Sequence, residues 1–306
     1  MKKLFKHVLP EIFVACAIIL LLWNAGEIRS SNRKMPVSAQ TGLTIHFIDV
    51  GQGMATLAES GGQYMLVDGG GYESADKMLG YLETAGVERL NYLVISHYDS
   101  DHLYGAVRVL ENYEVGQVLC PDYETDSATY HYFTEMIAQA DDGLSSVENG
   151  VDFVNHPKPG ESFEFGDCSF TVVSPVRMDY PEENNLSLGI RLVCGEVSFL
   201  MMGDAELESE YDMCDSGLPL KSTVYLVNHH GSSSSSSQQL LKTIQPEYAV
   251  ISCGQNNDYG HPAGSVLERL EEFGVEVFRT DIQGTVTART DGNEIQWAAE
   301  KNLAEQ

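Results

Sequence analysis

The sequence predicts an α/β fold with two groups of strands, at about residues 43–120 and 162–297. From Gly42 onward, short apolar runs are separated by glycine turns at residues 51–53 and 61–62, as in a meander of strands. Helical patterns alternate with later strands, and several apolar runs end in His or Asp. The length of 306 residues allows one large domain or two small ones.

Each expected element follows from a local pattern. Strands are expected where branched apolar residues lie between turn residues, namely at 43–50, 54–59, 63–68, 90–95, 115–120, 162–165, 168–174, 188–194, 197–202, 222–228 and 248–253. Helices are expected near 74–85, from about 105, near 127–139 and at 238–244. The six-serine run at 232–237 is interpreted as a loop and the start of the last of these helices.

The amino-terminal segment differs in composition from the rest of the chain. Residues 1–6 are basic, and residues 9–23 are apolar except for Pro10 and Glu11. This pattern predicts a signal peptide or membrane anchor at 1–23, with a buried core helix as the alternative. The polar residues 24–41 are expected to be a linker, and residues 42–300 the folded domain. By the positive-inside rule, that domain is extracytoplasmic, either membrane-anchored or secreted.

The expected domain is strongly acidic. The whole chain has a formal charge of −27, and residues 35–306 carry 12 basic and 43 acidic side chains, a formal charge of −31. The basic residues are scattered, so the sequence contains no basic strip. Long-range repulsion therefore argues against tight non-specific binding of nucleic acid unless metal ions offset the charge. The sequence contains no CxxC pair, so it gives no sign of a zinc site with thiolate ligands. Cys194 and Cys253 lie in strand-like runs and are expected to be small buried residues.

The strongest functional signal lies in residues 90–102 (LNYLVISHYDSDH). An apolar run typical of a buried strand is followed, within six residues, by four potential metal ligands, His97, Asp99, Asp101 and His102. A single such residue is usually solvated or caps a helix, but four together at a strand end are unusual. One cation could not easily use all four. Two cations could, with His97 and Asp99 on the first and Asp101 and His102 on the second. In an extended continuation, His102 faces inward only if the backbone bends.

Three later strands also end in ligand-type residues. Asp204 follows one strand, the pair His229-His230 follows the next, and His261 precedes Pro262 after the third. Only one of the adjacent histidines can point inward from a strand end, and strand alternation does not decide which.

Together these residues resemble the metallo-β-lactamase superfamily, and within it the exported hydrolase domain of ComEC-type competence (DNA-uptake) proteins and their free-standing relatives. The resemblance extends from Gly42 to about Trp297. The motifs occur in the family's order, at residues 47–53 (FIDVGQG), 66–70 (LVDGG), 96–102 (SHYDSDH), 184–187 (NNLS), 203–204 (GD), 229–232 (HHGS) and 259–262 (YGHP). It implies an αββα sandwich of two mixed β-sheets packed face to face with helices outside.

The resemblance also implies roles for individual residues. Asp204 would bridge two divalent ions, zinc or manganese, and Asp101, His230 and His261 would act in catalysis, with His230 also in the metal shell. Residues expected to contact substrate are Asn185, Ser187, His229 and Ser232, and those expected near the site are Asp49 and Asp68.

The sequence departs from the family pattern in three places. Asp99 stands where the superfamily's H-x-H-x-D-H motif has its second His, and Met54 stands where relatives often have Asp. A third His, usual between the cluster and the bridging Asp, is absent, with Asn184-Asn185 near its place. The harder ligand set makes manganese as plausible as zinc, and the first metal is expected to be weakly held.

We therefore predict an exported metal-dependent hydrolase, a phosphodiesterase or nuclease-like enzyme that uses a metal-bound hydroxide. The expected substrate is DNA or another phosphodiester, membrane contact is through the amino-terminal segment, and no protein partner is implied. One alternative is a hydrolase of a small ester, lactone or lactam. A second is a non-catalytic metal-binding module. The sequence contains no G-x-S-x-G elbow, which argues against an acyl-serine mechanism.

Overall fold

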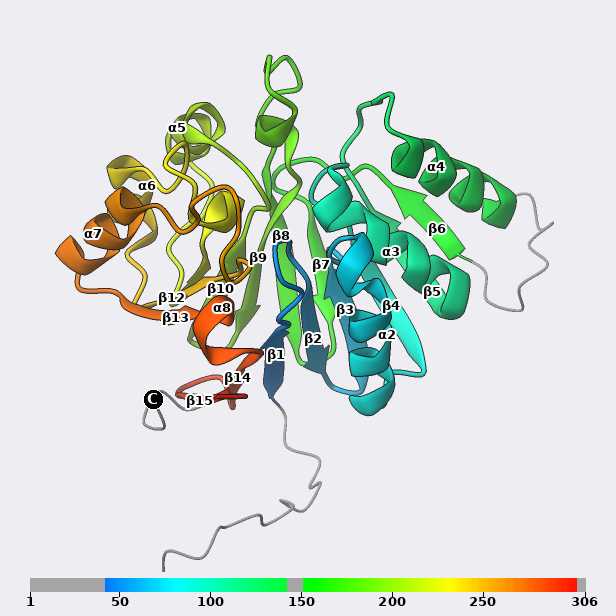
Figure 1. Cartoon of the computed structure of the whole chain (residues 1–306), viewed down its shortest axis with the longest axis horizontal. Helices are drawn as coiled ribbons and strands as arrows, with labels where there is room; N and C mark the ends of the chain where they lie inside the picture. Colours follow the sequence, from blue (N-terminus) through cyan, green and yellow to red (C-terminus); the bar gives the residue numbers. More distant parts are fainter. Residues whose placement is uncertain (1–41, 142–150, 302–306) are drawn as a thin grey trace, which may run out of the picture. The chain divides into compact units, whose positions relative to one another are not determined.

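The computed structural model describes residues 42–141 and 151–301 (Figure 1). The signal or anchor predicted at 1–23 and the linker at 24–41 lie outside these residues. Within the two ranges, no helix combines the length and the apolar character needed to cross a membrane.

The described residues form two mixed β-sheets, which confirms the predicted fold class. The first sheet contains eight strands, in the order β15 (Ile295–Ala299), β14 (Val286–Thr290), β1 (Leu43–Phe47), β2 (Thr56–Ser60), β3 (Gln63–Val67), β4 (Arg89–Val94), β5 (Glu114–Leu119) and β6 (Val151–Asn155). The second contains seven, in the order β13 (Glu276–Arg279), β12 (Tyr248–Ile251), β11 (Val224–Leu226), β10 (Val197–Met201), β9 (Gly189–Cys194), β8 (Cys168–Ser174) and β7 (Ser162–Phe165). Strands β3 to β6 are parallel, as are β10 to β13.

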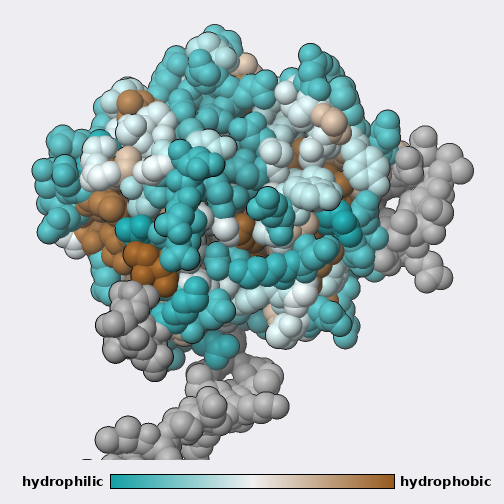
Figure 2. Space-filling model, in the orientation of Figure 1, coloured by the Kyte–Doolittle hydropathy of each residue, from teal (hydrophilic) through white to brown (hydrophobic). Residues whose placement is uncertain are grey.

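Helices cover the outer face of each sheet. Helices α2 (Ala75–Thr84), α3 (Ser100–Asn112) and α4 (Ala128–Asp141) pack on the first sheet, and α5 (Leu207–Asp215), α6 (Gln238–Ile244) and α7 (Gly264–Glu272) pack on the second (Figure 1). Short helical turns lie at η1 (Tyr72–Ser74), η2 (Glu183–Leu186), η3 (Asn228–Gly231) and α8 (Thr280–Gln283). A third apolar cluster fills the space between the sheets, where alternate residues of β1 (Leu43, Ile45 and Phe47) meet Phe170, Leu192 and Phe199 of the second sheet. The face seen in Figure 2 is mainly hydrophilic, with an apolar patch on the side where α7 and β13 lie.

The predicted division of strands between the two halves is wrong at the carboxyl end. Strands β14 and β15 do not join the second group but the first sheet, because β14 pairs with the free edge of β1 in antiparallel register, Leu43 opposite Thr290. Val286 and Ala288 then add to the apolar layer between the sheets. Closing the edge of β1 removes a row of unpaired backbone groups, which favours this long-range pairing.

Two local predictions also need correction. Helix α3 begins at Ser100 rather than near residue 105, so the ligand cluster is not an extended segment: Asp99 takes the N-cap position and His102 lies in the first turn. The start of the helix is the bend that His102 requires. Cys194 is not an isolated buried residue, since it forms a disulfide with Cys168 between β8 and β9, whereas Cys253 is buried and free as predicted.

Two glycines let α3 approach the end of β3 closely. A Cβ on Gly69 would lie 2.1 Å from the nitrogen of Ala106, and a Cβ on Gly105 would lie 1.9 Å from the carbonyl oxygen of Gly69. In this contact, Gly69 N donates to the carbonyl of His102 at 2.8 Å. The glycine-rich turn after β3 therefore fixes the first turn of α3, and with it His102, against the sheet.

Candidate metal centre

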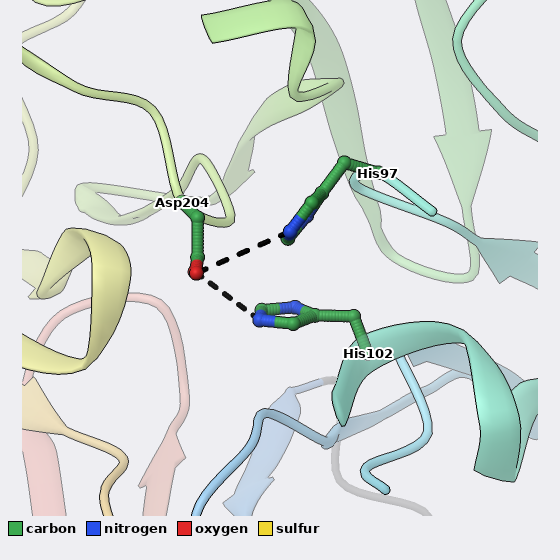
Figure 3. A group of neighbouring side chains, drawn as sticks. All are labelled: His97, His102 and Asp204. Carbon is green, nitrogen blue, oxygen red and sulfur yellow. Dashed lines mark ion pairs between the residues drawn. The ribbon is translucent and has the colours of Figure 1, made fainter. Parts of the chain in front are cut away.

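The candidate ligands come from both sheets. His97 to His102 follow β4 of the first sheet, whereas Asp204 and the pair His229-His230 follow β10 and β11 of the second. In Figure 3 the side chains of His97, His102 and Asp204 point toward one another. Because these strands run into the same region of the sandwich, residues more than 100 positions apart in the chain meet around the carboxylate of Asp204.

The ligands predicted for the second cation lie close together. The Nε2 atom of His230 lies 3.3 Å from Oδ2 of Asp101 and 3.2 Å from Nε2 of His102, which is itself 3.2 Å from Oδ1 of Asp204. Donor atoms bonded to one cation at about 2.0–2.2 Å are about 3–3.5 Å apart. Asp101, His102 and His230 therefore have the spacing of a single metal shell, and Asp204 lies beside both histidines of that group.

The first group is wider. His97 Nε2 lies 3.7 Å from Oδ2 of Asp99 and 4.0 Å from Oδ2 of Asp204. This nitrogen and Asp204 Oδ1 are both buried without a hydrogen-bond partner among the described residues, although His102 Nε2 lies at ion-pair distance, 3.2 Å, from that oxygen. Buried polar atoms are almost always paired. The unpaired atoms of His97 and Asp204 therefore fit a centre in which this chain holds a pair of divalent ions.

The charges within the cluster support the same arrangement. Burial alone would raise the pKa of both carboxyls, but His230 and His102 hold the pKa of Asp101 below its ordinary value, and that of Asp204 well below. Burial alone would lower the pKa of the histidines, yet Asp204 raises that of His102 well above its usual range and that of His230 to about 9. A cation would replace these protons and interact with the same ionised carboxylates.

Asp68 orients one of the ligands. Its buried carboxylate lies 2.8 Å from Nδ1 of His102 and accepts hydrogen bonds from the amide and hydroxyl of Ser96 at 2.8 and 2.7 Å. A carboxylate on Nδ1 leaves Nε2 free to bind a metal, as in many metal sites. Asp49, also expected near the site, lies in the segment after β1. Its carboxylate accepts hydrogen bonds from Gly51 N and from Nζ of Lys77 in α2.

The adjacent histidines both face Asp204, so the expectation that only one could do so is wrong. Their Nε2 atoms lie 3.6 Å (His229) and 3.5 Å (His230) from the same oxygen, Oδ2. Strand alternation does not apply here because both residues have left-handed backbones, with φ of 50° and 55°. His230 Nδ1 donates to the carbonyl of Ser252 at 2.9 Å, whereas His229 Nδ1 lies 3.1 Å from Oε1 of Glu206.

His261 lies at the edge of the cluster. Its ring centre is 5.6 Å from that of His229 and 6.2 Å from that of His230, and Tyr259 stacks on it with ring centres 5.6 Å apart. Burial and the two neighbouring histidines lower its pKa, so the ring is neutral at neutral pH. Its Nδ1 is buried without a partner among the described residues. A pocket of about 490 Å³ has this histidine in its lining, together with Arg279 and Lys301.

Three residues expected to contact substrate make hydrogen bonds within the chain, and their contact with substrate stays a prediction. Asn185 is buried, and its Oδ1 accepts from the backbone of Glu206 and Ser209 at the start of α5. Ser187 is buried and its hydroxyl accepts from Asp204 N at 3.3 Å, behind the cluster. Ser232 bonds to Ser234 within its own loop. Sequence reasoning missed Glu206, although it is a carboxylate two positions after Asp204, and it missed the buried Glu210.

A comparison with protein families gives the same assignment as the geometry. The family described as the metallo-beta-lactamase superfamily matches residues 48–255. The chain belongs to this superfamily. Among solved structures, the metallo-beta-lactamase fold protein YhfI from Bacillus subtilis aligns with a TM-score of 0.54 at 12% identity, covering 81% of this chain and 100% of that one. The diiron β-hydroxylase CmlA from Streptomyces venezuelae aligns with a TM-score of 0.54 at 16% identity, covering 81% and 54%.

Several curated proteins are similar to this chain in sequence. ComE operon protein 3 of Bacillus subtilis (strain 168) is 30% identical over 263 residues, which is 80% of this chain and 33% of that protein. Competence protein ComA of Neisseria gonorrhoeae is 32% identical over 240 residues, 78% and 31%. Recombination protein 2 of Haemophilus influenzae is 30% identical over 262 residues, 83% and 30%. The chain spans about a third of the length of these relatives.

The departures from the superfamily pattern can now be placed. Met54 is buried in the layer between the sheets, so its thioether packs in the core rather than lining the centre. Asp99 remains beside His97, with its side chain 53% exposed. Asn185, near the place of the usual third histidine, points to α5 instead of the ligands. From the expected set, the first metal position therefore keeps His97 and Asp204, with Asp99 beside His97, and His102 also lies within 4.8 Å of the ligand atoms of His97 and Asp204.

Proposed function

We propose that this metallo-hydrolase of the metallo-beta-lactamase superfamily cleaves phosphodiesters outside the cytoplasm, with two divalent ions held around Asp204. The observation that carries the proposal is the convergence of three carboxylates and three histidines on this point: Asp99, Asp101, Asp204, His97, His102 and His230. When bound, such ions lower the pKa of water and offset the charge that develops on an attacked phosphorus or carbonyl centre. The carboxylate-rich set favours manganese as much as zinc.

The chain's own residues supply the remaining functions. Asp68 and the carbonyl of Ser252 hold the rings of His102 and His230 so that each Nε2 faces Asp204. Asp99 and Asp101 form the open rim, with side chains 53% and 34% exposed. His261 is neutral and half-buried at this rim, which suits it to transfer a proton to or from the substrate.

A phosphodiester substrate is favoured by the hard ligand set and by the similarity to two proteins named for competence and recombination. The alternative, a small ester, lactone or lactam, is favoured by the acidic chain, whose formal charge is −27.

Full-length protein loaded with zinc or with manganese should be tested against single-stranded DNA, a bis-aryl phosphodiester, and a panel of esters and lactams. We expect metal-dependent phosphodiester cleavage and about two ions per chain by elemental analysis. Asp204→Ala should lose metal and activity together, whereas Asp49→Ala should keep both. Turnover of an ester or lactam alone would identify the alternative function. Unchanged metal content in Asp204→Ala would remove its bridging role.

We also propose an extracytoplasmic location, with membrane contact through residues 1–23. The basic residues Lys2, Lys3 and Lys6 precede an apolar stretch, which favours export of the residues that follow. The Cys168–Cys194 disulfide supports the same location, because disulfides form and persist in oxidising compartments. A carboxyl-terminal alkaline phosphatase fusion should be active in intact cells. An inactive fusion would place the domain inside.

A further inference from the structure

Glu206 holds His229 in a fixed orientation. This residue takes the N-cap position of α5, and its Oε1 atom lies 3.1 Å from Nδ1 of His229. The same oxygen accepts a hydrogen bond from the hydroxyl of Ser234 at 2.9 Å and one from the amide of Asn184 at 3.4 Å. With Nδ1 engaged by a carboxylate, the lone pair of His229 lies on Nε2, which points at Asp204.

This pair repeats the arrangement of Asp68 and His102 on the opposite side of Asp204. In both pairs a carboxylate contacts Nδ1, at 2.8 Å for His102 and 3.1 Å for His229, and Nε2 approaches the central carboxylate. His102 Nε2 lies 3.2 Å from Oδ1, and His229 Nε2 lies 3.6 Å from Oδ2. Oδ2 is also the oxygen 4.0 Å from His97. Oδ2 is thus approached by His97, His229 and His230, and His230 is already placed with Asp101 and His102, which leaves His229 beside His97 as a further histidine at this oxygen.

We propose that His229, oriented by Glu206, is a ligand of the first metal ion, together with His97, Asp99 and Asp204. The inference rests on the two-ion centre proposed above and fills the gap left by the absent histidine. Asn185, near the place of that histidine, contributes indirectly, because its Oδ1 accepts from Glu206 N at 3.0 Å and so helps to position the carboxylate.

The local backbone supports a functional role for His229. Two successive left-handed residues other than glycine are unfavourable unless the surroundings enforce them. Here Asn228 is fixed by a hydrogen bond of 3.0 Å to the buried Glu210, and Gly231 continues the left-handed turn with φ of 81°. This left-handed turn brings the rings of His229 and His230 to the carboxylate of Asp204. It thus provides two histidines, whereas an extended strand end would provide one.

The competing role for His229 is proton transfer to the substrate. Measuring metal affinity distinguishes the two roles, because only a ligand is needed to bind the ion. Zinc and manganese affinities of the full chain should be measured by titration calorimetry, with bound ions counted by elemental analysis, for wild type, His229→Ala, Glu206→Ala and Glu206→Gln. Glu208→Gln is the matched control, because Glu208 lies in the first turn of the same helix and pairs with Arg177 instead. Circular dichroism and melting of the metal-free proteins report on folding.

We expect two ions in wild type and in Glu208→Gln. His229→Ala should keep one ion and lose about 100-fold or more in affinity for the other, and Glu206→Ala should weaken the same ion by about 10–100-fold. Glu206→Gln, which can still accept from His229, should lose less. If folded His229→Ala binds both ions with wild-type affinity, the assignment is overturned, and loss of turnover in that protein would indicate proton transfer instead. One ion in wild type would overturn it together with the two-ion centre while leaving metal-dependent hydrolysis intact, whereas no ion in wild type would overturn metal-dependent hydrolysis as well.

Discussion

Glu210 offers the sharpest test of how the fold supports the centre. Its carboxylate is fully buried in α5 and accepts from the backbone amides of Ser236 and Ser237, at 2.5 and 2.7 Å, and from the side-chain amide of Asn228 at 3.0 Å. These bonds connect α5 to the serine run and to the turn that carries His229 and His230. The serine run is therefore a packed loop rather than a simple connector.

Replacing Glu210 with Ala leaves three buried donors without an acceptor. Each unpaired buried group costs about 1–3 kcal/mol, and because the three are neighbours we expect about 3–5 kcal/mol in total. Glu210→Gln keeps Oε1 for Asn228 and Ser236 but sets an NH₂ group against Ser237 N, so it should cost about 1–3 kcal/mol. For a domain of this size, the Ala variant should melt roughly 8–15 °C below wild type.

Scanning calorimetry of the metal-free proteins measures these differences, with Glu268→Ala on the exposed face of α7 as the control. The metal affinity of Glu210→Gln, measured at a temperature where it is folded, should also fall, because Asn228 precedes both histidines. A Glu210→Ala protein that melts within about 2 °C of wild type would refute the reasoning, since a buried acceptor of three bonds cannot be removed at so small a cost.

Three further predictions concern the positioning of ligands, close packing and pH. Asp68→Asn should fold but lose about 10–100-fold in affinity for the ion bound by His102, because an amide facing Nδ1 favours the wrong tautomer; calorimetric titration with unchanged affinity would contradict this. Gly105→Ala should destabilise the protein by about 3 kcal/mol or more in denaturant unfolding, because the added Cβ would clash with the carbonyl oxygen of Gly69. Helix propensity alone favours Ala by about 1 kcal/mol, so a more stable variant would mean that α3 can move away from Gly69. Burial, with Arg289, lowers the pKa of His46 to about 4, below its ordinary value of 6.5, so the unfolded chain binds the proton more readily. Stability should then fall by up to about 3 kcal/mol as pH drops from 6.5 to 4, and His46→Gln should show a correspondingly flatter decline in the same titration of unfolding free energy; an equally steep decline would exclude His46 as a cause.

The sequence by itself determined the elements whose signals are local. Glycine turns and branched apolar runs located β7 and β8 at their observed bounds, and the serine run led correctly into α6, where Ser237 accepts from Leu240 N as a helix cap. The ligand types after β4, β10 and β11 predicted which strand ends gather. This inference works because parallel strands and the connections that follow them bring their carboxyl ends to one edge of a fold.

Only the tertiary structure decided how distant segments combine and where side chains point. The pairing of β14 with β1, the disulfide of Cys194 and the capping role of Asn185 depend on contacts between segments that no local pattern records. The same holds for the adjacent histidines: residue type predicts an extended strand end, but contacts with Glu206, Glu210 and Ser252 enforce left-handed backbones that turn both rings to Asp204. Local sequence sets the preference of each residue, whereas the free energy of packing and hydrogen bonding across the whole domain can override a local preference of a few kcal/mol.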